Sequence, residues 1–377
     1  MELDAGGTPW LSRFKDPGLA RRLIARLGRE LSRPVRVMEV CGTHTWSISR
    51  SGIRGALPEG LELRSGPGCP VCVTDQTDLD RMIALAGRPG LVVASFGDMV
   101  RVPGSAMSLE EARALGADVR VVYSPLDAVA LAGSTGSQVV FLGVGFETTA
   151  PVAALAVEEA ARRSLKNFSL FSRHKLLPPA LRALISDSRT RVEGFILPGH
   201  VSTVLGRRGF DFLASELGVP AVITGFDPVD ILLGLKELVG MVCRGEARVV
   251  NAYGRVVRED GNPRARAAMD RVFQPADELW RGLGPIPQSG LRLKPEFSPF
   301  DAEARFPLPD PAPRPLPRGC SCGEVLKGIL APADCPLFGR ACTPERPVGP
   351  CMVSSEGACA AYYHYGWVPA REGGEGR

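Results

Sequence analysis

The sequence predicts an α/β protein, with two parallel-sheet domains that flank a cleft and a C-terminal module rich in cysteine. Two observations carry this prediction. Between about residues 36 and 254, short apolar runs rich in β-branched residues alternate with helical patterns, which is the order of βαβ units. In addition, six of the ten cysteines lie in the last sixth of the chain. We place the domains at residues 1–130, 131–258 and 259–377.

Size and composition narrow the class of protein. With 377 residues, 45% of them hydrophobic and 23% charged, the chain is long enough for two or three domains with their own cores. A net charge of +4 without basic runs between aromatic residues argues against a nucleic-acid partner. Because the sequence shows no signal-peptide pattern and no apolar run near ~18 residues, we expect a soluble, cytoplasmic protein with no membrane contact. In that compartment, cysteines serve as ligands, redox thiols or core residues rather than as disulfides.

The expected elements alternate along the first two domains. Strands are predicted at 35–40, 90–96, 119–124, 138–146, 192–199 and 220–226, and helices at 108–115, 151–165 and 227–242. The last helix should begin with Asp227 as N-cap and Pro228 as its first residue. After Pro285 the pattern ends. Proline at every second position from 307 to 317 predicts an extended strap that cannot join a sheet interior, and the final REGGEGR is expected to be disordered.

Polar motifs follow several predicted strands where the apolar run ends. Loops from the carboxyl ends of parallel strands converge on one edge, where ligands bind in open α/β sheets. The residues expected to share a cleft there are Cys41, His44, Glu147, Thr148, Thr149 and His200. Alternatively, the two threonines cap the next helix, and His200 is a hydrogen-bonded structural histidine. GVGFET lacks the third glycine of the dinucleotide fingerprint, which argues against NAD.

Two short motifs near the N-terminus have the spacing of metal ligands. Cys41 and His44 form C-x2-H, and Cys69 and Cys72 form C-x2-C. Each pair can chelate one ion because a tight turn aims both side chains the same way, so together they could make a Cys3His zinc site. The alternative is a redox C-x-x-C with a nucleophilic thiolate. A purely structural turn is least expected, because two close thiols oxidise readily.

The C-terminal cysteines have a different spacing. Cys320-x14-Cys335-x6-Cys342-x16-Cys359 is too wide for a zinc ribbon, whose ligands come in C-x2-C pairs. It is compatible with an iron–sulfur cluster, whose four corners can be reached from different loops. Cys322 and Cys351 remain and could form a dithiol beside the cluster. The spacing alone does not show which four of the six thiols are the cluster ligands.

Five motifs, in order, resemble one known family over about residues 15–368. MEVCGTHT, GPGCPVC, GFETTAP, LPGHVS and the run from CSCGEVLKG to GACAAYY are similar to the HypD family, which matures the iron centre of [NiFe]-hydrogenases. The resemblance implies two α/β domains and a third module with a [4Fe–4S] cluster. It also implies a complex with the small partner HypC, as a scaffold on which an Fe(CN)2CO unit is assembled. HypE and HypF would supply cyanide, and the hydrogenase large subunit would receive the unit.

The same resemblance implies roles for the cysteines. Cys41 would hold the iron, a soft centre that favours thiolate, and Cys69 and Cys72 would be a redox pair or auxiliary iron ligands. The cluster ligands would be Cys320, Cys335, Cys342 and Cys359, with Cys322 and Cys351 as the second dithiol.

Electrons could pass from the cluster through Cys322 and Cys351 to Cys69 and Cys72. His44 could lower the thiol pKa of Cys41 or orient a cyanide nitrogen, while Glu147 and His200 would handle protons or form hydrogen bonds. The protein would be mainly an assembly scaffold with redox activity. Two rival functions stay open: an iron–sulfur-dependent thiol–disulfide oxidoreductase, and a zinc-stabilised binding protein without a redox role.

Overall fold

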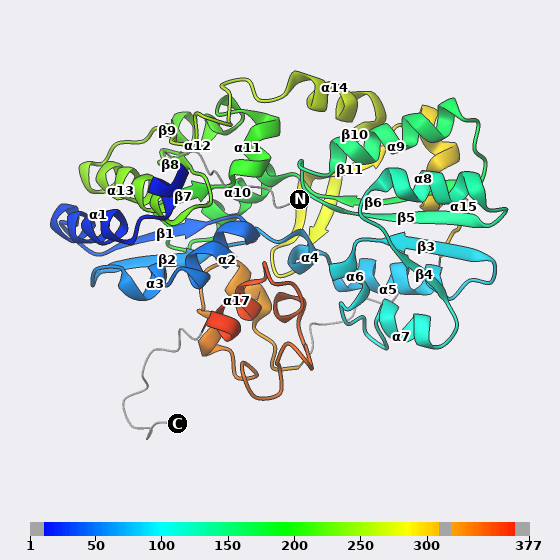
Figure 1. The fold of residues 1–377 in the computed structure, drawn as a ribbon, viewed down its shortest axis with the longest axis horizontal. Coiled ribbons are helices and arrows are strands. Elements are labelled where there is room, and N and C mark those ends of the chain that lie inside the picture. Colours follow the sequence, from blue (N-terminus) through cyan, green and yellow to red (C-terminus); the bar gives the residue numbers. More distant parts are fainter. Residues whose placement is uncertain (1–10, 309–317, 366–377) are drawn as a thin grey trace, which may run out of the picture.

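The computed structural model describes residues 11–308 and 318–365. Most of the predicted proline strap and the REGGEGR end therefore lie outside the described residues. Figure 1 shows two parallel sheets side by side, with an antiparallel hairpin between them and the cysteine-rich segment packed below. No helix within the two described ranges is long and apolar enough to cross a membrane.

The first sheet contains five parallel strands in the order β2-β1-β7-β8-β9. Its helices are amphipathic and cover it: α1 and the long α13 pack together on one face. The Asp16 side chain caps α1, and α13 begins at Pro228 and ends at Gly245, whose φ of 67° stops the helix. The strands are β1 (Val35–Glu39), β2 (Leu61–Ser65), β7 (Gly194–Leu197), β8 (Ala221–Ile223) and β9 (Val249–Asn251); the helices are η1 (Leu11–Lys15), α1 (Pro17–Glu30), α2 (Gly42–Arg50), α3 (Ile53–Ala56), α11 (Gly199–Leu205), η2 (Arg208–Phe210), α12 (Phe212–Ser215) and α13 (Pro228–Arg244).

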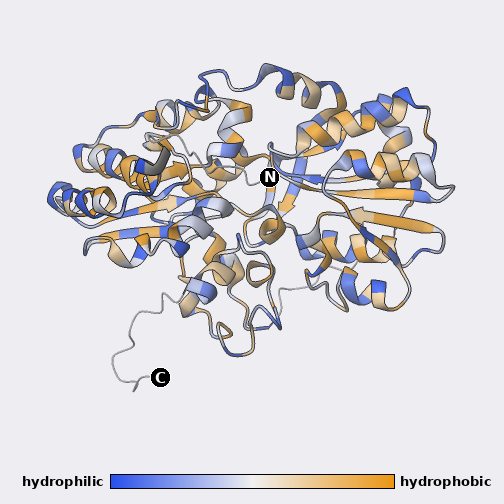
Figure 2. Cartoon of the chain, in the orientation of Figure 1, coloured by the Kyte–Doolittle hydropathy of each residue, from blue (hydrophilic) through white to orange (hydrophobic). Residues whose placement is uncertain are grey.

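The second sheet contains four parallel strands in the order β4-β3-β5-β6. Its inner strands are buried except at Gln138, the first residue of β5, as expected for a parallel sheet covered on both faces. Figure 2 shows the same concentration of apolar residues on the strands. The elements are α4 (Pro70–Val73), α5 (Gln76–Ala86), β3 (Leu91–Ser95), α6 (Gly97–Val100), α7 (Leu109–Ala114), β4 (Asp118–Val121), α8 (Pro125–Ser134), β5 (Gln138–Gly145), α9 (Ala150–Arg162), β6 (Phe168–His174) and α10 (Leu177–Ser186).

The α/β class and all six predicted strands are confirmed, as β1, β3, β4, β5, β7 and β8, and the three predicted helices correspond to α7, α9 and α13. Asp227 is the N-cap residue of α13, but its side chain makes no capping bond. The prediction missed β2, β6 and β9. The strand β6 is buried throughout although it carries serine, arginine and histidine, so its sequence does not form an apolar run.

The predicted domain division at residue 130 does not coincide with the sheets. Residue 130 lies inside α8, and β1 pairs with β7, in the register Val37 to Gly194. The chain leaves the first sheet after β2, forms the second sheet, and returns to the first with β7. The alternation of strands and helices reveals that strands exist, but it does not tell which strands become neighbours.

After the sheets, the chain forms a helix, a hairpin and a module of short helices. The hairpin has a bulge between Ala276 and Glu278, and it contacts β6 and α10 of the second sheet. It was not predicted, because its strands contain prolines and charges. The C-terminal helix packs on α2. These elements are α14 (Pro263–Val272), β10 (Phe273–Trp280), β11 (Gly284–Leu293), η3 (Pro295–Phe300), α15 (Ala302–Arg305), α16 (Cys322–Leu326), η4 (Pro332–Asp334), η5 (Pro350–Met352) and α17 (Ala358–Tyr365).

Candidate functional site

Cys41 lies at the carboxyl end of β1, as the N-cap residue of α2. Its side chain is buried, with 7% of the residue exposed. The GPG segment before Cys69 packs directly against it: Gly68 O accepts a bond from the Gly42 N–H at 2.9 Å. A Cβ at Gly68 would lie 2.2 Å from the Cys41 nitrogen, so only glycine permits this approach. The two motifs that carry Cys41 and Cys69 are therefore in backbone contact.

The surroundings of Cys41 disfavour a free thiolate. Burial raises the pKa of the thiol to about 12; the backbone N–H groups of His44 and Thr43 oppose this shift, and the carboxylates of Glu356 and Glu39 add to it. Glu39 accepts bonds from the Thr45 hydroxyl at 2.6 Å and from the Cys41 N–H at 3.2 Å. A free Cys41 thus keeps its proton near neutral pH, and a metal cation bound there would have to displace it.

The His44 ring forms its hydrogen bonds with Thr224 and Gly225 and not with Cys41. Its Nε2 lies 2.9 Å from both Gly225 O and Thr224 Oγ1. Because a carbonyl only accepts, Nε2 carries the proton and Nδ1 keeps its lone pair. Nδ1 is buried with no hydrogen-bond partner in the part of the chain that the structure describes. Burial lowers the pKa of His44 to about 4, so the ring is neutral, and the backbone N–H of His44 rather than an imidazolium favours the Cys41 thiolate.

Glu356, a side chain of the C-terminal module, and a second histidine, His200, also belong to this site. Glu356 accepts a bond of 2.7 Å from the Thr43 hydroxyl, next to Cys41. His200 is exposed at the start of α11 and lies against Phe226, with ring centroids 4.2 Å apart, and Phe226 also contacts the His44 ring at 4.7 Å. Burial lowers the pKa of His200, and the charge of Glu356 opposes the shift. Cys41, His44, His200 and Glu356 therefore form one neighbourhood, of which the sequence predicted the first three.

Glu147 lies apart from that neighbourhood. It is fully buried at the end of β5, where Oε1 accepts a bond of 2.8 Å from the Leu177 N–H. Burial raises its pKa to about 7, and Oε2 has no partner among residues 11–308 and 318–365. Thr149 is the N-cap residue of α9, yet its hydroxyl donates back to Phe146 O rather than capping the helix. Thr148 is exposed.

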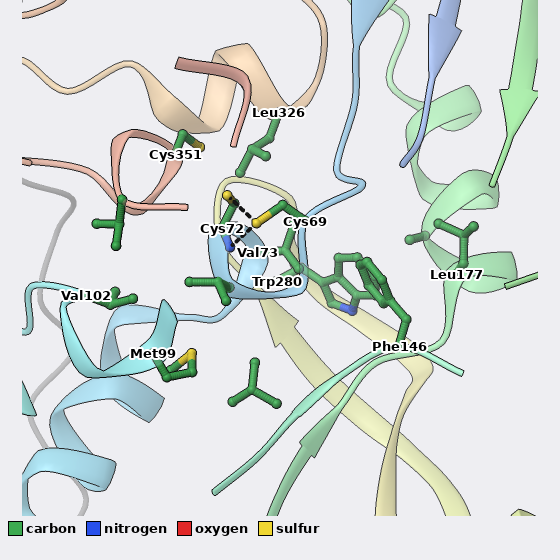
Figure 3. Packing of buried hydrophobic residues seen from close by; sticks show 14 of the residues in the cluster. Cys69, Cys72, Val73, Met99, Val102, Phe146, Leu177, Trp280, Leu326 and Cys351 are labelled. Carbon is green, nitrogen blue, oxygen red and sulfur yellow. Dashed lines mark hydrogen bonds between the residues drawn. The ribbon is translucent and has the colours of Figure 1, made fainter. Parts of the chain in front are cut away.

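Cys69 and Cys72 face each other in one turn of helix. The Cys72 thiol donates to Cys69 Sγ at 2.6 Å, and the Cys72 N–H also points at that sulfur, at 3.3 Å. Both residues are buried. Figure 3 shows the pair above Val73 and Trp280, with Cys351 of the C-terminal module on the other side. Burial raises the pKa of Cys72 well above its ordinary value, and the nearby thiols of Cys351 and Cys69 add to the shift.

The thiols continue from this turn into the C-terminal module. The thiols of Cys322, Cys359 and Cys72 are close enough to Cys351 to act on its pKa, which is raised. Cys322 in turn contacts Cys320. We call the series Cys69, Cys72, Cys351 and Cys322 the thiol chain. One small cavity in the module is lined by all six of its cysteines: Cys320, Cys322, Cys335, Cys342, Cys351 and Cys359.

No ready-made metal site is formed among the described residues. No three His, Cys, Asp or Glu side chains there are grouped so that they could hold one metal ion, which applies both to Cys41, His44, Cys69 and Cys72 and to the C-terminal cysteines. The six C-terminal cysteines nevertheless line one cavity, and thiolates are the donors that hold iron–sulfur clusters. The identity of the cluster and its four ligands stays a prediction.

Comparisons with known proteins agree with the motifs. The family model described as "HypD: Hydrogenase formation hypA family" matches residues 18–366. The chain is 46% identical over 374 residues to "Hydrogenase maturation factor HypD" of Rhodobacter capsulatus, covering 96% of this chain and 99% of the relative. It is 45% identical over 350 residues to the HypD protein of Escherichia coli, with 92% and 93% covered. A "Hydrogenase expression/formation protein HupD" of Azotobacter chroococcum is 45% identical over 367 residues, with 95% and 97% covered. The chain therefore belongs to the HypD family of hydrogenase maturation factors.

Proposed function

We propose that this protein is the scaffold on which the Fe(CN)2CO unit of [NiFe]-hydrogenase is assembled, in complex with a partner of the HypC type. Cys41 would hold the iron cargo. Cyanide would come from HypE with HypF, and the hydrogenase large subunit would receive the finished unit. The thiol chain is the observation that carries this proposal, because it gives the turn beside Cys41 a continuous sulfur contact with the C-terminal module.

The residues around Cys41 suit the capture of an iron cation, before its cyanide ligands are added. The nearby carboxylates Glu39 and Glu356 raise the cost of a bare thiolate, and the same negative charge attracts a metal cation. The Nδ1 lone pair of the neutral His44 supplies an acceptor that no described residue uses. His200 and Thr43 offer hydrogen-bonding groups at the same place.

The thiol chain supports a two-electron exchange. The Cys351 thiolate would attack Cys72 Sγ of a Cys69–Cys72 disulfide, so that Cys69 leaves as a thiolate and takes up a proton. Cys322 would then attack Cys351, which releases Cys72 as a thiol and leaves a Cys322–Cys351 disulfide. Two electrons thereby move to the CPVC turn. A [4Fe–4S] cluster held by Cys320, Cys335, Cys342 and Cys359 would supply single electrons when bound.

Of the two rival functions, an oxidoreductase acting on external disulfides suits the burial less well. Cys72 is completely buried and Cys69 is 4% exposed, so a macromolecular disulfide could not reach either sulfur without movement of the C-terminal module. A zinc-stabilised protein would need Cys41, His44, Cys69 and Cys72 to converge on one ion, and these four described residues do not form such a group.

Infrared spectroscopy of the protein co-purified with its HypC-type partner tests the proposal. Cyanide and carbonyl stretching bands are expected in the wild type and should be absent from Cys41→Ala, whose iron–sulfur absorbance should remain. Cys243→Ala, on the distant helix α13, is the matched control and should keep both. Bands of equal intensity in Cys41→Ala would remove Cys41 from the iron site.

A further inference from the structure

The tip of the β10–β11 hairpin joins the CPVC turn to the C-terminal module. Trp280 lies beside the turn, and the Arg281 N–H donates to Val73 O at 2.9 Å. Gly282, with a φ of 78°, touches the module: a Cβ there would lie 2.3 Å from the Cα of Gly323, the residue after Cys322. The hairpin tip is therefore fixed between the two sets of cysteines.

Arg281 is a buried cation at this junction. It is 1% exposed. Its guanidinium bonds only neutral acceptors, with Nε donating to Thr74 O at 2.8 Å and Nη1 to Gln76 Oε1 at 3.1 Å. Nη2 has no hydrogen-bond partner, and no carboxylate forms an ion pair with Arg281 among residues 11–308 and 318–365. A buried charge without a counter-charge costs several kcal/mol, so an anion is expected at this place.

Sulfur is one source of negative charge for Arg281. Neighbouring thiols and burial raise the pKa values of Cys320 and Cys322 in the module, and the positive charge of Arg281 opposes that shift. Cys322 directly precedes Gly323, which the hairpin tip touches. Other buried arginines differ in this respect: Arg173 is paired with Asp78 and Glu303. The unpaired guanidinium therefore belongs to the hairpin tip that touches the cysteine-rich module next to Cys322.

We propose that Arg281 is the buried counter-charge of the C-terminal sulfur centre. Its guanidinium compensates the negative charge of sulfur at Cys320 and Cys322, and its bonds to Val73 and Thr74 tie that charge to the CPVC turn. Arg281 is thus a positioning residue for the thiol chain. The inference rests on the proposed function in one respect, that the sulfur centre carries a redox-active cluster.

The consequence is a change in reduction midpoint. Each added electron makes the sulfur centre more negative, so a fixed cation nearby stabilises the reduced form. Arg281→Gln should shift the ratio of oxidised to reduced centre at a fixed potential about tenfold toward the oxidised form, which is ~59 mV for a one-electron couple. Arg281→Lys keeps the charge and should stay near the wild type. Arg101→Gln is the matched control, because Arg101 bonds the module at Val353 O away from the thiols.

The experiment is a redox titration of anaerobically purified full-length variants, followed by visible absorbance and electron paramagnetic resonance. If Arg281→Gln does not fold, Gln76→Glu provides a second variant. Its carboxylate would accept the bond from Arg281 Nη1 and neutralise the guanidinium charge, so the reduction midpoint should also fall. An unchanged midpoint in the variant that folds, or an equal fall in Arg281→Lys and Arg281→Gln, would overturn the proposal.

A second readout does not need the cluster. In iron-free protein, Cys320 should react with iodoacetamide severalfold more slowly in Arg281→Gln than in the wild type, while Cys243 reacts at the same rate in both. If the purified wild type shows no iron–sulfur absorbance, the cluster of the proposed function is refuted. The alkylation rates would still test the role of Arg281. Equal alkylation rates of Cys320 in Arg281→Gln and the wild type would refute the role of Arg281 as a counter-charge.

Discussion

The two sulfur sites of this protein differ in the charge that surrounds them. Cys41 lies among carboxylates, with Glu39 and Glu356 raising the pKa of a thiol already raised by burial. The pKa values of the C-terminal thiols Cys320 and Cys322 are raised as well, by neighbouring thiols and burial, but there the guanidinium of Arg281, which has no carboxylate partner among the described residues, opposes the shift. The sites therefore differ in the sign of their fixed charge: carboxylates favour a cation that replaces the thiol proton, whereas a guanidinium stabilises the negative charge of sulfur bound in a metal centre.

The two sulfur sites also differ in the secondary-structure elements that hold their cysteines. Cys41 is held by a strand end and a helix start, so its position depends on the first sheet. The C-terminal cysteines lie on short helices and turns around one cavity. We therefore expect the first site to persist without metal and the second to depend on the group that it binds.

The largest expected effect separates the two sites. Cys335→Ser should remove the brown colour and about four irons per chain, whereas Cys322→Ser should leave the cluster largely intact because Cys322 belongs to the thiol chain. Iron analysis and visible absorbance measure both variants. Bleaching by Cys322→Ser together with an intact cluster in Cys320→Ser would show that the ligands were chosen wrongly.

A smaller effect comes from a buried carboxylate outside both sites. Burial raises the folded-state pKa of Glu147 from 4.5 to about 7, so the folded protein holds a proton that the unfolded chain releases within that window. The free energy of unfolding therefore falls as pH rises through the window and stays lower above it. Glu147→Gln should remove this loss, making the variant more stable than the wild type by about 3 kcal/mol near pH 8 but not near pH 4.

Denaturant unfolding at the two pH values measures this difference. Glu110→Gln, at an exposed position of α7, serves as the control and should change stability little at either pH. A stability gain in Glu147→Gln that is equal at both pH values would mean that ionisation of Glu147 is not its cause.

The smallest expected effect comes from reducing the difference in charge between the two sulfur sites. Glu356→Gln removes one negative charge near Cys41 but retains an oxygen for the Thr43 hydroxyl. The Cys41 thiolate becomes less costly, so its alkylation should be severalfold faster, while iron binding should weaken. Mass spectrometry of alkylated protein measures the rate, with Cys243 as internal reference. Slower alkylation of Cys41 in the variant would contradict the role assigned to the carboxylate.

Much of the fold follows from local patterns in the sequence. The strands β3, β5 and β7 are nearly continuous apolar runs, and such runs are recognisable one at a time. The pairing of β1 with β7 and the hairpin at 273–293 are not, because they depend on contacts between distant segments. The strand β6 was missed because its polar side chains are satisfied by such contacts, as in the pairing of Arg173 with Glu303.

The candidate site divides in the same way. Cys41, Cys69 and Cys72 stand in short motifs whose spacing is informative by itself. Arg281 lies in no motif and Glu356 was not singled out within the C-terminal run; their relevance arises from neighbours more than 200 residues away in the chain, Thr74 and Thr43. The orientation of the His44 ring could not be predicted for a similar reason, since Thr224 and Gly225 hold its Nε2, and the role of this ring stays a prediction.

The thiol chain is the central claim, and disulfide mapping tests it most directly. Protein purified without oxygen would be alkylated before and after mild oxidation, and its cysteines located by mass spectrometry. We expect Cys69 and Cys72 to be labelled when reduced and linked to each other when oxidised, with Cys320 and Cys335 shielded throughout. In Cys69→Ser, Cys72 should instead form a disulfide with Cys351, its contact in the module. Protection of Cys69 and Cys72 in the reduced sample, relieved by a zinc chelator, would contradict the account.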